Sequence, residues 1–344
     1  MPTLHTDIYQ RIRRLFNRPV LSHHTIEGTH LLVGFVKKLR EFAEIPHLPN
    51  QHLGRFGYFL KKPFVITVHD LARYFDLVGN GCFIRKPCLQ DAAWLLLDYR
   101  GVSKACKVIV PSNYTKKDLV KHLKIPDERV EVVYHGIDEA FKPTEEPRLF
   151  RDPYILYVGS EHPRKNLATA LKAFKMLKRD PRFRSLKFVK AGPPGGSEYN
   201  FRKYTQAMVS SLKLGKNVVF VNRWLSLREL ASLYTNAELF VFPSLYEGFG
   251  WPPLEAMACG CPVVASRAAC IPEVLGEAAV YASPQKPKEW AEAMEELLTD
   301  EGLRRKYARM GLERASLFTW EKAAKELLRI YEDVEEAYQK LRPH

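Results

Sequence analysis

Short runs of apolar, often β-branched residues recur along the chain, and most are followed by a stretch with helical periodicity. Near-continuous apolar runs of this length are typical of parallel strands that are buried on both faces. The expected strands are Phe64–His69, Lys107–Pro111, Val130–Tyr134, Tyr154–Gly159, Leu186–Ala191, Asn217–Val221, Leu239–Pro243 and Pro262–Ser266. Helices are expected between them over Tyr114–His122, Asn166–Lys178, Leu227–Asn236 and Leu254–Cys259. This alternation predicts a doubly wound α/β architecture.

The chain has 344 residues, which is too long for one ordinary core and favours two domains. The segment Gly136–Pro153 is rich in proline and charge and has no periodicity, so we interpret it as the linker. We therefore expect an amino-terminal Rossmann-like domain over residues 1–147 and a second one over 148–320. The chain is expected to be helical from Lys286 onward, with a terminal helix over 321–344 that crosses back to the first domain.

The start of the chain departs from this pattern. A Rossmann-type domain normally opens with a buried strand and a glycine-rich turn. Here the first residues are polar and basic, and the earliest apolar runs are a short one after Arg18 and Leu31–Val36. We expect the amino-terminal domain to be abbreviated or differently started.

Composition indicates a folded globular protein, with 46% hydrophobic and 27% charged residues. The formal net charge of +14 favours an anionic partner, which can be nucleic acid, an acidic membrane surface or a phosphorylated ligand. The basic residues are scattered, and no helix-turn-helix or zinc-finger spacing is present, which argues against nucleic acid.

The six cysteines form no C-x-x-C pair, so we interpret them as buried thiols in a reducing compartment. The amino terminus lacks the apolar core of a signal peptide, and no stretch reaches the roughly 18 apolar residues of a membrane span. We expect a cytoplasmic protein that makes peripheral contact with the inner face of an anionic membrane.

The segment Ser244–Ser266 carries the strongest chemical signal. Its turn contains Gly248 and Gly250, which let backbone amides approach a ligand, and prolines then open a helix. Amides at a helix start form an anion site. Glu247 precedes the turn and Glu255 follows eight positions later, within reach of different parts of one ligand. Two such glutamates alone would also fit an ordinary helix start.

Two further strand ends carry polar residues. After the strand Tyr154–Gly159, Arg164 and Lys165 stand beside the start of a helix, where they form either an anion site or a solvated basic turn. The strand before Asp70 ends in His69, and no second carboxylate cluster supports a metal site there. His69 has either a structural or a cleft role, and Asp70 either positions a ligand or caps a helix. Ser112 or Asn113 is the expected N-cap of the following helix.

The segment Ser244–Ser266 resembles the signature of glycosyltransferase family 4, retaining enzymes with the GT-B fold. The resemblance extends over roughly residues 46–320. It implies that the carboxyl-terminal domain binds a nucleoside-diphosphate sugar and the amino-terminal domain binds the acceptor. It also implies that Arg164 and Lys165 clamp the diphosphate and stabilise the charge that develops on it, so that no metal ion is needed.

Further roles follow from the same resemblance. Glu255 would hold the ribose hydroxyls, and Glu247 would contact the transferred sugar near its reacting carbon. His69 would face the donor sugar from the other domain. The remaining donor contacts are expected from the amides of Gly248, Phe249 and Gly250, from the turn at Gly159 and from the loop of Arg223.

The resemblance thus implies a retaining transferase that moves a hexosyl group from a UDP- or GDP-linked sugar to a hydroxyl acceptor. The expected acceptor is lipid-linked or a polysaccharide, and no cofactor other than the donor is expected. Two alternatives remain open: a non-catalytic or degenerate nucleotide-sugar-binding protein, and a nucleotide-sugar epimerase.

Overall fold

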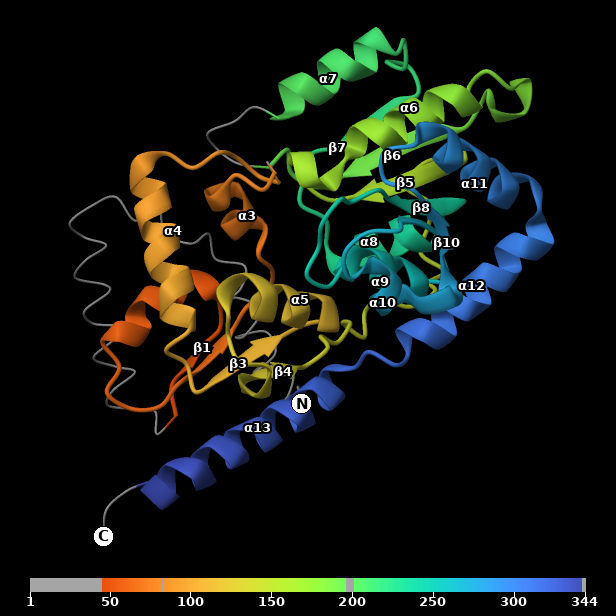
Figure 1. Ribbon diagram of the computed structural model, residues 1–344. Helices are drawn as coiled ribbons and strands as arrows, with labels where there is room; N and C mark the ends of the chain where they lie inside the picture. The colour runs from red at the N-terminus through yellow and green to blue at the C-terminus, as the bar shows by residue number, and fades with distance from the viewer. Residues whose placement is uncertain (1–44, 82, 196–200, 342–344) are drawn as a thin grey trace.

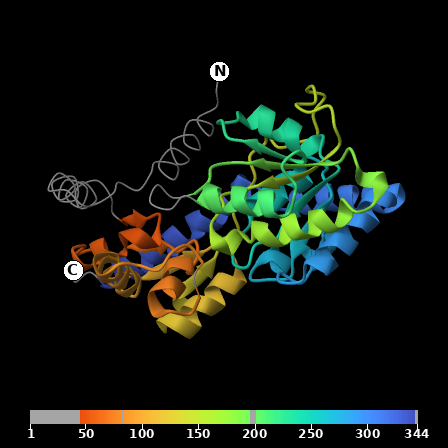
Figure 2. The ribbon, with the colours of Figure 1, turned by 90° about the horizontal axis from the view of Figure 1, so that it is seen from above.

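A computed structural model describes residues 45–81, 83–195 and 201–341 of the chain (Figure 1). Two parallel sheets lie in separate halves of the molecule (Figures 1 and 2). The first contains β1 (His47–Leu48), β2 (Val65–Thr67), β3 (Lys107–Val110) and β4 (Val130–Val132). The second contains β5 (Tyr154–Val158), β6 (Lys187–Ala191), β7 (Val218–Val221), β8 (Leu239–Phe242), β9 (Val263–Ser266) and β10 (Val280–Ala282).

The helices alternate with these strands. Those of the first half are α3 (Ala72–Val78), α4 (Leu89–Val102) and α5 (Asn113–Asp118). Those of the second half are α6 (Leu167–Leu177), α7 (Phe201–Ser211), α8 (Leu227–Thr235), α9 (Trp251–Ala258), α10 (Ile271–Leu275), α11 (Pro287–Thr299) and α12 (Glu301–Ala315). The last helix is α13 (Trp320–Leu341).

The second sheet has the strand order β10-β9-β8-β5-β6-β7, and every pair in it is parallel. The chain starts at β5 in the middle, builds outward on one side to β7, and then returns to β8 on the other side of β5. This is the Rossmann order, and its direction reverses between β5 and β8. Ligands of such sheets bind in the crevice beyond the carboxyl ends of those two strands.

The two faces of the second sheet are covered by different helices. Tyr154 and Leu156 of β5 pack with α8, α9 and α10, whereas Ile155 and Tyr157 pack with α6 and α11. Because successive strand residues point to opposite faces, an apolar residue at every position is needed to fill both cores. This explains the unbroken apolar runs and confirms the predicted doubly wound α/β class.

The first sheet is also covered on both faces. Helices α3, α4 and α5 pack on one face, and α13 packs on the other through Ala323, Ile330 and Val334. His47 of β1 hydrogen-bonds Tyr331 of α13 through Nδ1 at 2.5 Å. Figure 1 shows α13 running back along the first sheet after leaving the second half.

The expected strands are all present, and each observed strand ends within two residues of its expected limits. The helical tail expected from Lys286 is instead divided into three helices. Asp300 ends α11 and caps α12 by accepting a hydrogen bond from the Leu303 amide at 2.8 Å. Residues 316–319 form a second break, where Phe318 O accepts from the Ile137 amide at 3.1 Å. The unusual start expected before residue 45 lies outside the described residues.

Among the described cysteines, Cys88, Cys106, Cys259, Cys261 and Cys270 are free thiols. None of the described helices combines the length and apolar composition needed to cross a membrane.

Candidate functional site

The carboxyl ends of β5 and β8 bring two loops together at the point where the strand order reverses. The loop after β5 contains Arg164, whose carbonyl oxygen accepts a hydrogen bond from the Leu245 amide of the loop after β8 at 2.7 Å. Asn166 donates through Nδ2 to the carbonyl oxygens of Pro243 and Pro284 at 3.0 and 2.7 Å. These bonds fix the two loops against each other.

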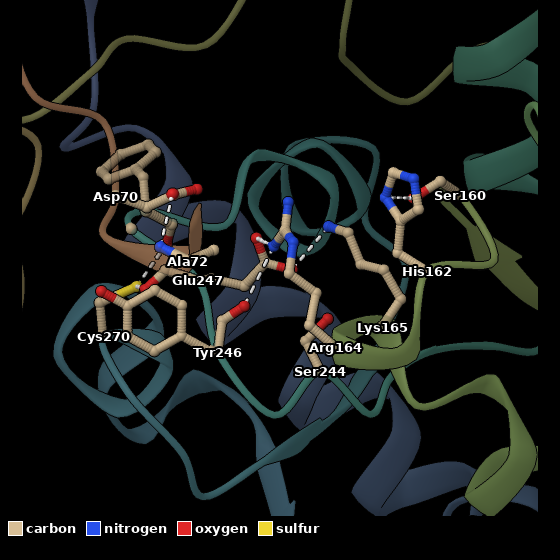
Figure 3. A network of polar contacts seen from close by, with 12 residues as sticks. Asp70, Ala72, Ser160, His162, Arg164, Lys165, Ser244, Tyr246, Glu247 and Cys270 are labelled. Carbon is tan, nitrogen blue, oxygen red and sulfur yellow. Dashed lines mark hydrogen bonds and ion pairs between the residues drawn. The ribbon is translucent and has the colours of Figure 1, made fainter. Parts of the chain in front are cut away.

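Glu247 is the centre of the resulting cluster, shown in Figure 3. Its two carboxylate oxygens accept hydrogen bonds from different cations: Arg164 at 2.6 Å and Lys165 at 2.5 Å. The side chain is buried, with only 6% of the residue exposed. Burial alone would raise the pKa of Glu247, but the charges of Arg164 and Lys165 lower that pKa to about 2. Glu247 is therefore ionised at neutral pH.

The two cations respond differently to the same carboxylate. Burial lowers the pKa of Lys165, and Glu247 only partly offsets this effect. For Arg164, burial also opposes the charge, but the attraction of Glu247 prevails and the pKa is raised. A further anion beside Lys165 would stabilise its charge, so this pair is suited to binding an anionic group.

The turn after Glu247 presents backbone donors next to these cations. Gly250 has a positive φ of 97° and is the residue before α9. Within the described part of the chain, the N–H groups of Gly248, Phe249 and Gly250 have no hydrogen-bond acceptor. Unpaired amides at a helix start, close to two cations, are suited to binding an anion.

His69 reaches the same region from the first half of the molecule. Its Nε2 hydrogen-bonds the carbonyl oxygen of Pro49 at 3.0 Å, and its amide donates to Gln51 Oε1 at 3.0 Å. Burial lowers the pKa of His69, so the ring is neutral at neutral pH. Asp70 Oδ1 accepts from the Ala72 amide at 3.0 Å, which gives Asp70 a capping contact at the start of α3.

The other predicted donor contacts are dispersed around this cluster. Glu255 lies in α9 and accepts a hydrogen bond from the Tyr234 hydroxyl at 3.0 Å. Gly159 follows β5 with a φ of 153°, which suits glycine. Arg223 is exposed and forms an ion pair with Glu229 at 2.6 Å. The ion pairs of the described residues do not connect Arg223 to the Glu247 cluster. Of the predicted site residues, Glu247, Arg164 and Lys165 are thus the ones that hydrogen-bond one another.

Sequence reasoning missed two aromatic residues of the interface between the halves. Tyr246 donates to Asp118 Oδ2 at 2.8 Å and accepts from the Leu71 amide at 3.2 Å. His135 stacks on Trp251 with ring centroids 4.7 Å apart and lies 5.5 Å from the ring of His69. Tyr246 directly precedes Glu247 in the sequence, and this neighbour relation could have placed it near the site. His135 lies in an irregular segment that gives no such signal.

The described residues contain no group of three or more His, Cys, Asp or Glu side chains placed to hold a metal ion. Metal independence nevertheless stays a prediction.

Comparisons with known proteins show the family of this chain. Residues 139–314 match the family described as "Glycosyl transferases group 1", and residues 5–141 match "Glycosyltransferase Family 4". The first of these matches covers the whole segment from the β5 loop to α12, and so includes both loops of the Glu247 cluster.

Similar proteins include two bacterial glycosyltransferases. A D-inositol 3-phosphate glycosyltransferase of Corynebacterium diphtheriae is 29% identical over 88% of this chain and 75% of its own length. The O-antigen chain mannosyltransferase RfbU of Salmonella typhimurium is 31% identical over 67% of this chain and 60% of its own length. The chain thus spans between three fifths and three quarters of these two relatives.

Solved structures share the fold. Sucrose-phosphate synthase from Thermosynechococcus elongatus superposes with a TM-score of 0.74 at 23% identity, over 93% of this chain and 82% of that one. Anabaena HepE in complex with UDP-glucose superposes with a TM-score of 0.73 at 18% identity, over 89% of this chain and 82% of that one.

Proposed function

This chain belongs to the glycosyl transferases group 1 family, glycosyltransferase family 4 with the GT-B fold, and from that premise we propose a specific reaction. The protein is a glycosyltransferase that transfers a hexosyl group from a nucleoside-diphosphate sugar to a hydroxyl acceptor, with retention of configuration at the reacting carbon.

The observation that carries this proposal is the meeting of Arg164 and Lys165 with the unpaired amides after Glu247. Loss of a nucleoside diphosphate from the sugar leaves negative charge on the departing phosphate oxygen. Two fixed cations and preorganised N–H donors stabilise that charge more in the transition state than in the ground state. The same arrangement supplies the positive charge that a divalent metal provides in other enzymes, so we propose that the reaction is metal-independent.

The environment of Glu247 limits its chemical role. With a pKa of about 2 it cannot give or take a proton efficiently at neutral pH. Both of its oxygens already accept hydrogen bonds from Arg164 and Lys165, which reduces their nucleophilicity. We therefore assign Glu247 to orienting the sugar and its cation partners. Retention then follows from a front-face reaction, in which the leaving phosphate and the incoming hydroxyl occupy the same face of the sugar.

We propose the remaining donor contacts from the residues around this cluster. Glu255 is the proposed ligand of the ribose hydroxyls, and the loop of Arg223 is proposed to contact the base. His69 is proposed to face the donor sugar, with Gly159 lining the nucleotide side. A UDP- or GDP-linked hexose suits this arrangement, because mannosyltransferases are among the relatives and HepE binds UDP-glucose. The O-antigen relatives support a polysaccharide or lipid-linked acceptor.

A donor panel tests the proposal. Purified protein is incubated with UDP-, GDP- and ADP-sugars and with an acceptor extract, and mass spectrometry measures released nucleoside diphosphate and glycosylated product. We expect turnover with one donor class, without added metal and with EDTA present. Glu247→Ala and Lys165→Ala should abolish most of it, whereas Lys288→Ala, a change on the exposed face of α11, should not.

Two results would contradict the proposal. Nucleotide binding with no transfer to any acceptor would favour a binding protein without catalysis. Conversion of one nucleotide sugar into its epimer, with the nucleotide still attached, would favour an epimerase.

Peripheral contact with an anionic membrane on the cytoplasmic side is proposed from the surface of α4. Leu89 is 93% exposed, and Leu96 and Leu97 are also exposed on this helix. Arg100 in the last turn of the helix and Lys104 just after it are also exposed. An exposed apolar strip with basic residues at its edge suits the surface of an acidic bilayer.

Sedimentation with liposomes containing phosphatidylglycerol tests this contact. We expect binding that weakens as salt rises and that is reduced in a Leu96→Ser, Leu97→Ser double variant. Leu328→Ser, which changes an exposed leucine of α13, is the matched control. Equal binding of the double variant and the control would contradict this surface.

A further inference from the structure

Three successive carbonyl groups of the turn after β8 each accept a hydrogen bond from a buried side chain. The single S–H of the Cys270 thiol is shared between the carbonyl oxygens of Glu247 and Phe249, which lie 3.1 and 3.3 Å from its sulfur. Between them, the carbonyl oxygen of Gly248 accepts from the hydroxyl of Ser112 at 2.7 Å. Thr115 adds a longer contact to the same oxygen at 3.3 Å. None of these bonds is part of a helix or a strand.

The donors come from opposite sides of the molecule. Cys270 precedes α10 in the second half, whereas Ser112 precedes α5 in the first half. Both residues are fully buried. Ser112 also caps α5, because its oxygen accepts a hydrogen bond from the Thr115 amide at 3.2 Å. That bond uses a lone pair of the hydroxyl. Its hydrogen has two acceptors within reach, the carbonyl oxygen of Gly248 at 2.7 Å and Thr115 Oγ1 at 3.0 Å, of which the first is nearer.

Holding these carbonyls also orients the amides that follow them. In a trans peptide the C=O of one residue and the N–H of the next are antiparallel within one plane. The described residues contain no cis peptide bond. Fixing the carbonyls of residues 247 and 249 therefore turns the N–H groups of Gly248 and Gly250 away from Cys270. Fixing the carbonyl of residue 248 turns the N–H group of Phe249 away from Ser112. Those are the N–H groups that lack an acceptor within the described part of the chain.

The thiol of Cys270 is suited to this role because it remains protonated. Burial raises the pKa of Cys270 well above its ordinary value, and the nearby charges of Glu247 and Glu273 act in the same direction. A protonated thiol donates to a carbonyl, whereas a thiolate would repel it.

We propose that Ser112 and Cys270 are positioning residues that aim the amides of residues 248–250 at the diphosphate of the donor. The proposal rests on the donor site assigned above. Because Ser112 belongs to the first half of the molecule, the amides are fully oriented only while the two halves are in contact. Alignment of the anion site is thereby coupled to closure of the halves around the donor.

The test compares ligands with and without the diphosphate. Isothermal titration measures the affinities of UDP and GDP, and those of uridine and guanosine as ligands that lack phosphate. We expect Cys270→Ala to weaken binding of the preferred nucleoside diphosphate by about tenfold, the size of one or two lost hydrogen bonds to a charged group. The affinity for the corresponding nucleoside should not change. Cys270→Ser should restore most of the loss, because a hydroxyl donates in place of the thiol.

Ser112→Gly removes the second donor, and glycine is itself tolerated at an N-cap, so α5 is retained. We expect the same selective loss of diphosphate affinity, together with a lower kcat. Cys261→Ala is the control, because Cys261 is an equally buried thiol that bonds to Ala237 and Pro262 instead of the turn. Circular dichroism and thermal melting confirm that each variant is folded.

The outcomes separate this proposal from the function on which it rests. If wild-type protein binds nucleoside diphosphates and transfers sugar, but Cys270→Ala and Ser112→Gly bind them as tightly as wild type, the positioning role is wrong. Parallel losses for nucleoside and nucleoside diphosphate would also overturn it, because they indicate general loosening of the site. Wild-type protein that neither binds nucleoside diphosphates nor transfers sugar contradicts the proposed function itself.

Discussion

The carbonyl oxygen of His69 lies so close to Gly248 that a β-carbon at residue 248 would be 1.7 Å from it. His69 follows the first sheet, and Gly248 belongs to the turn that carries the unpaired amides. The main chains of the two halves thus touch beside Glu247, and only a residue without a side chain permits this approach. The φ of Gly248 is not positive, so glycine is needed at this position for lack of space and not for its backbone conformation.

Gly248→Ala should therefore prevent full contact between the halves without unfolding either of them. We expect kcat/KM to fall by about a hundredfold or more, since a misplacement of about 1 Å at a reacting centre costs that much. Steady-state kinetics and thermal melting measure the two effects separately. Gly215→Ala is the control, because a β-carbon there would meet nothing within 4 Å. Unchanged kinetics in Gly248→Ala would show that this contact is not maintained during turnover.

Lys165→Ala should change both the rate and its dependence on pH. Removing one preorganised donor of this kind typically costs a factor of about 10² to 10³ in kcat. The pKa of Glu247, now about 2, should rise because one of its two cations is lost. Activity that needs ionised Glu247 will then decline at a higher pH on the acidic side than in wild type. A pH–rate profile measures both effects, and Lys165→Arg should preserve the wild-type acidic limb. An acidic limb that does not move in Lys165→Ala would contradict the assigned role of Glu247.

Local patterns were sufficient to predict the strands and the polar residues at their ends. A strand buried on both faces, such as β5 or β8, has an apolar residue at nearly every position. A short apolar run is therefore enough to predict it. Strand β1 was missed because it has only two residues, and β10, in which only Ala282 is fully buried, was missed as well. Helix α4 was missed because leucines lie on both its buried and its exposed sides, which removes the amphipathic period.

Contacts between the two halves were not accessible to sequence reasoning. Ser112 and Gly248 are separated by 136 positions, and Asn113 and Glu273 by 160. Ser112 was correctly predicted as an N-cap candidate, since capping depends on residues nearby in sequence. Its second bond to Gly248 depends on how two separately folded sheets meet, and no local pattern encodes that.

Glu273 of α10 holds the start of α5 in the other half. Its carboxylate accepts from the amides of Asn113 and Tyr114 at 2.7 and 2.9 Å, and from the Tyr134 hydroxyl at 2.8 Å. Glu273→Ala should remove these acceptors and favour separation of the halves. We expect a larger radius of gyration by small-angle X-ray scattering and a several-fold higher KM for the donor. Glu277→Ala, a nearby exposed glutamate, is the control. An unchanged radius of gyration and KM would mean that this contact does not hold the halves together.

Buried histidines should make the fold sensitive to mild acid. Burial lowers the pKa of His47 and His52 to about 4, and the pKa values of His69 and His135 are also lowered by burial. An unfolded histidine takes up its proton near pH 6.5, whereas these folded ones do so only at lower pH. The unfolded state therefore binds more protons as pH falls, and stability that is full above about pH 6.5 is lost progressively towards pH 4.

Two buried carboxyl groups act in the opposite direction, because burial raises the pKa values of Asp98 and Asp118. We expect the histidines to prevail because they are more numerous and their window lies at higher pH. Urea denaturation at pH 7.5, 6.5, 5.5 and 4.5 should show a midpoint that falls with pH. His47→Gln should flatten this dependence, because glutamine does not titrate and can still hydrogen-bond Thr67, as His47 does at 2.8 Å. A midpoint that stays constant from pH 7.5 to 4.5 would show that these histidines are not held neutral by the fold.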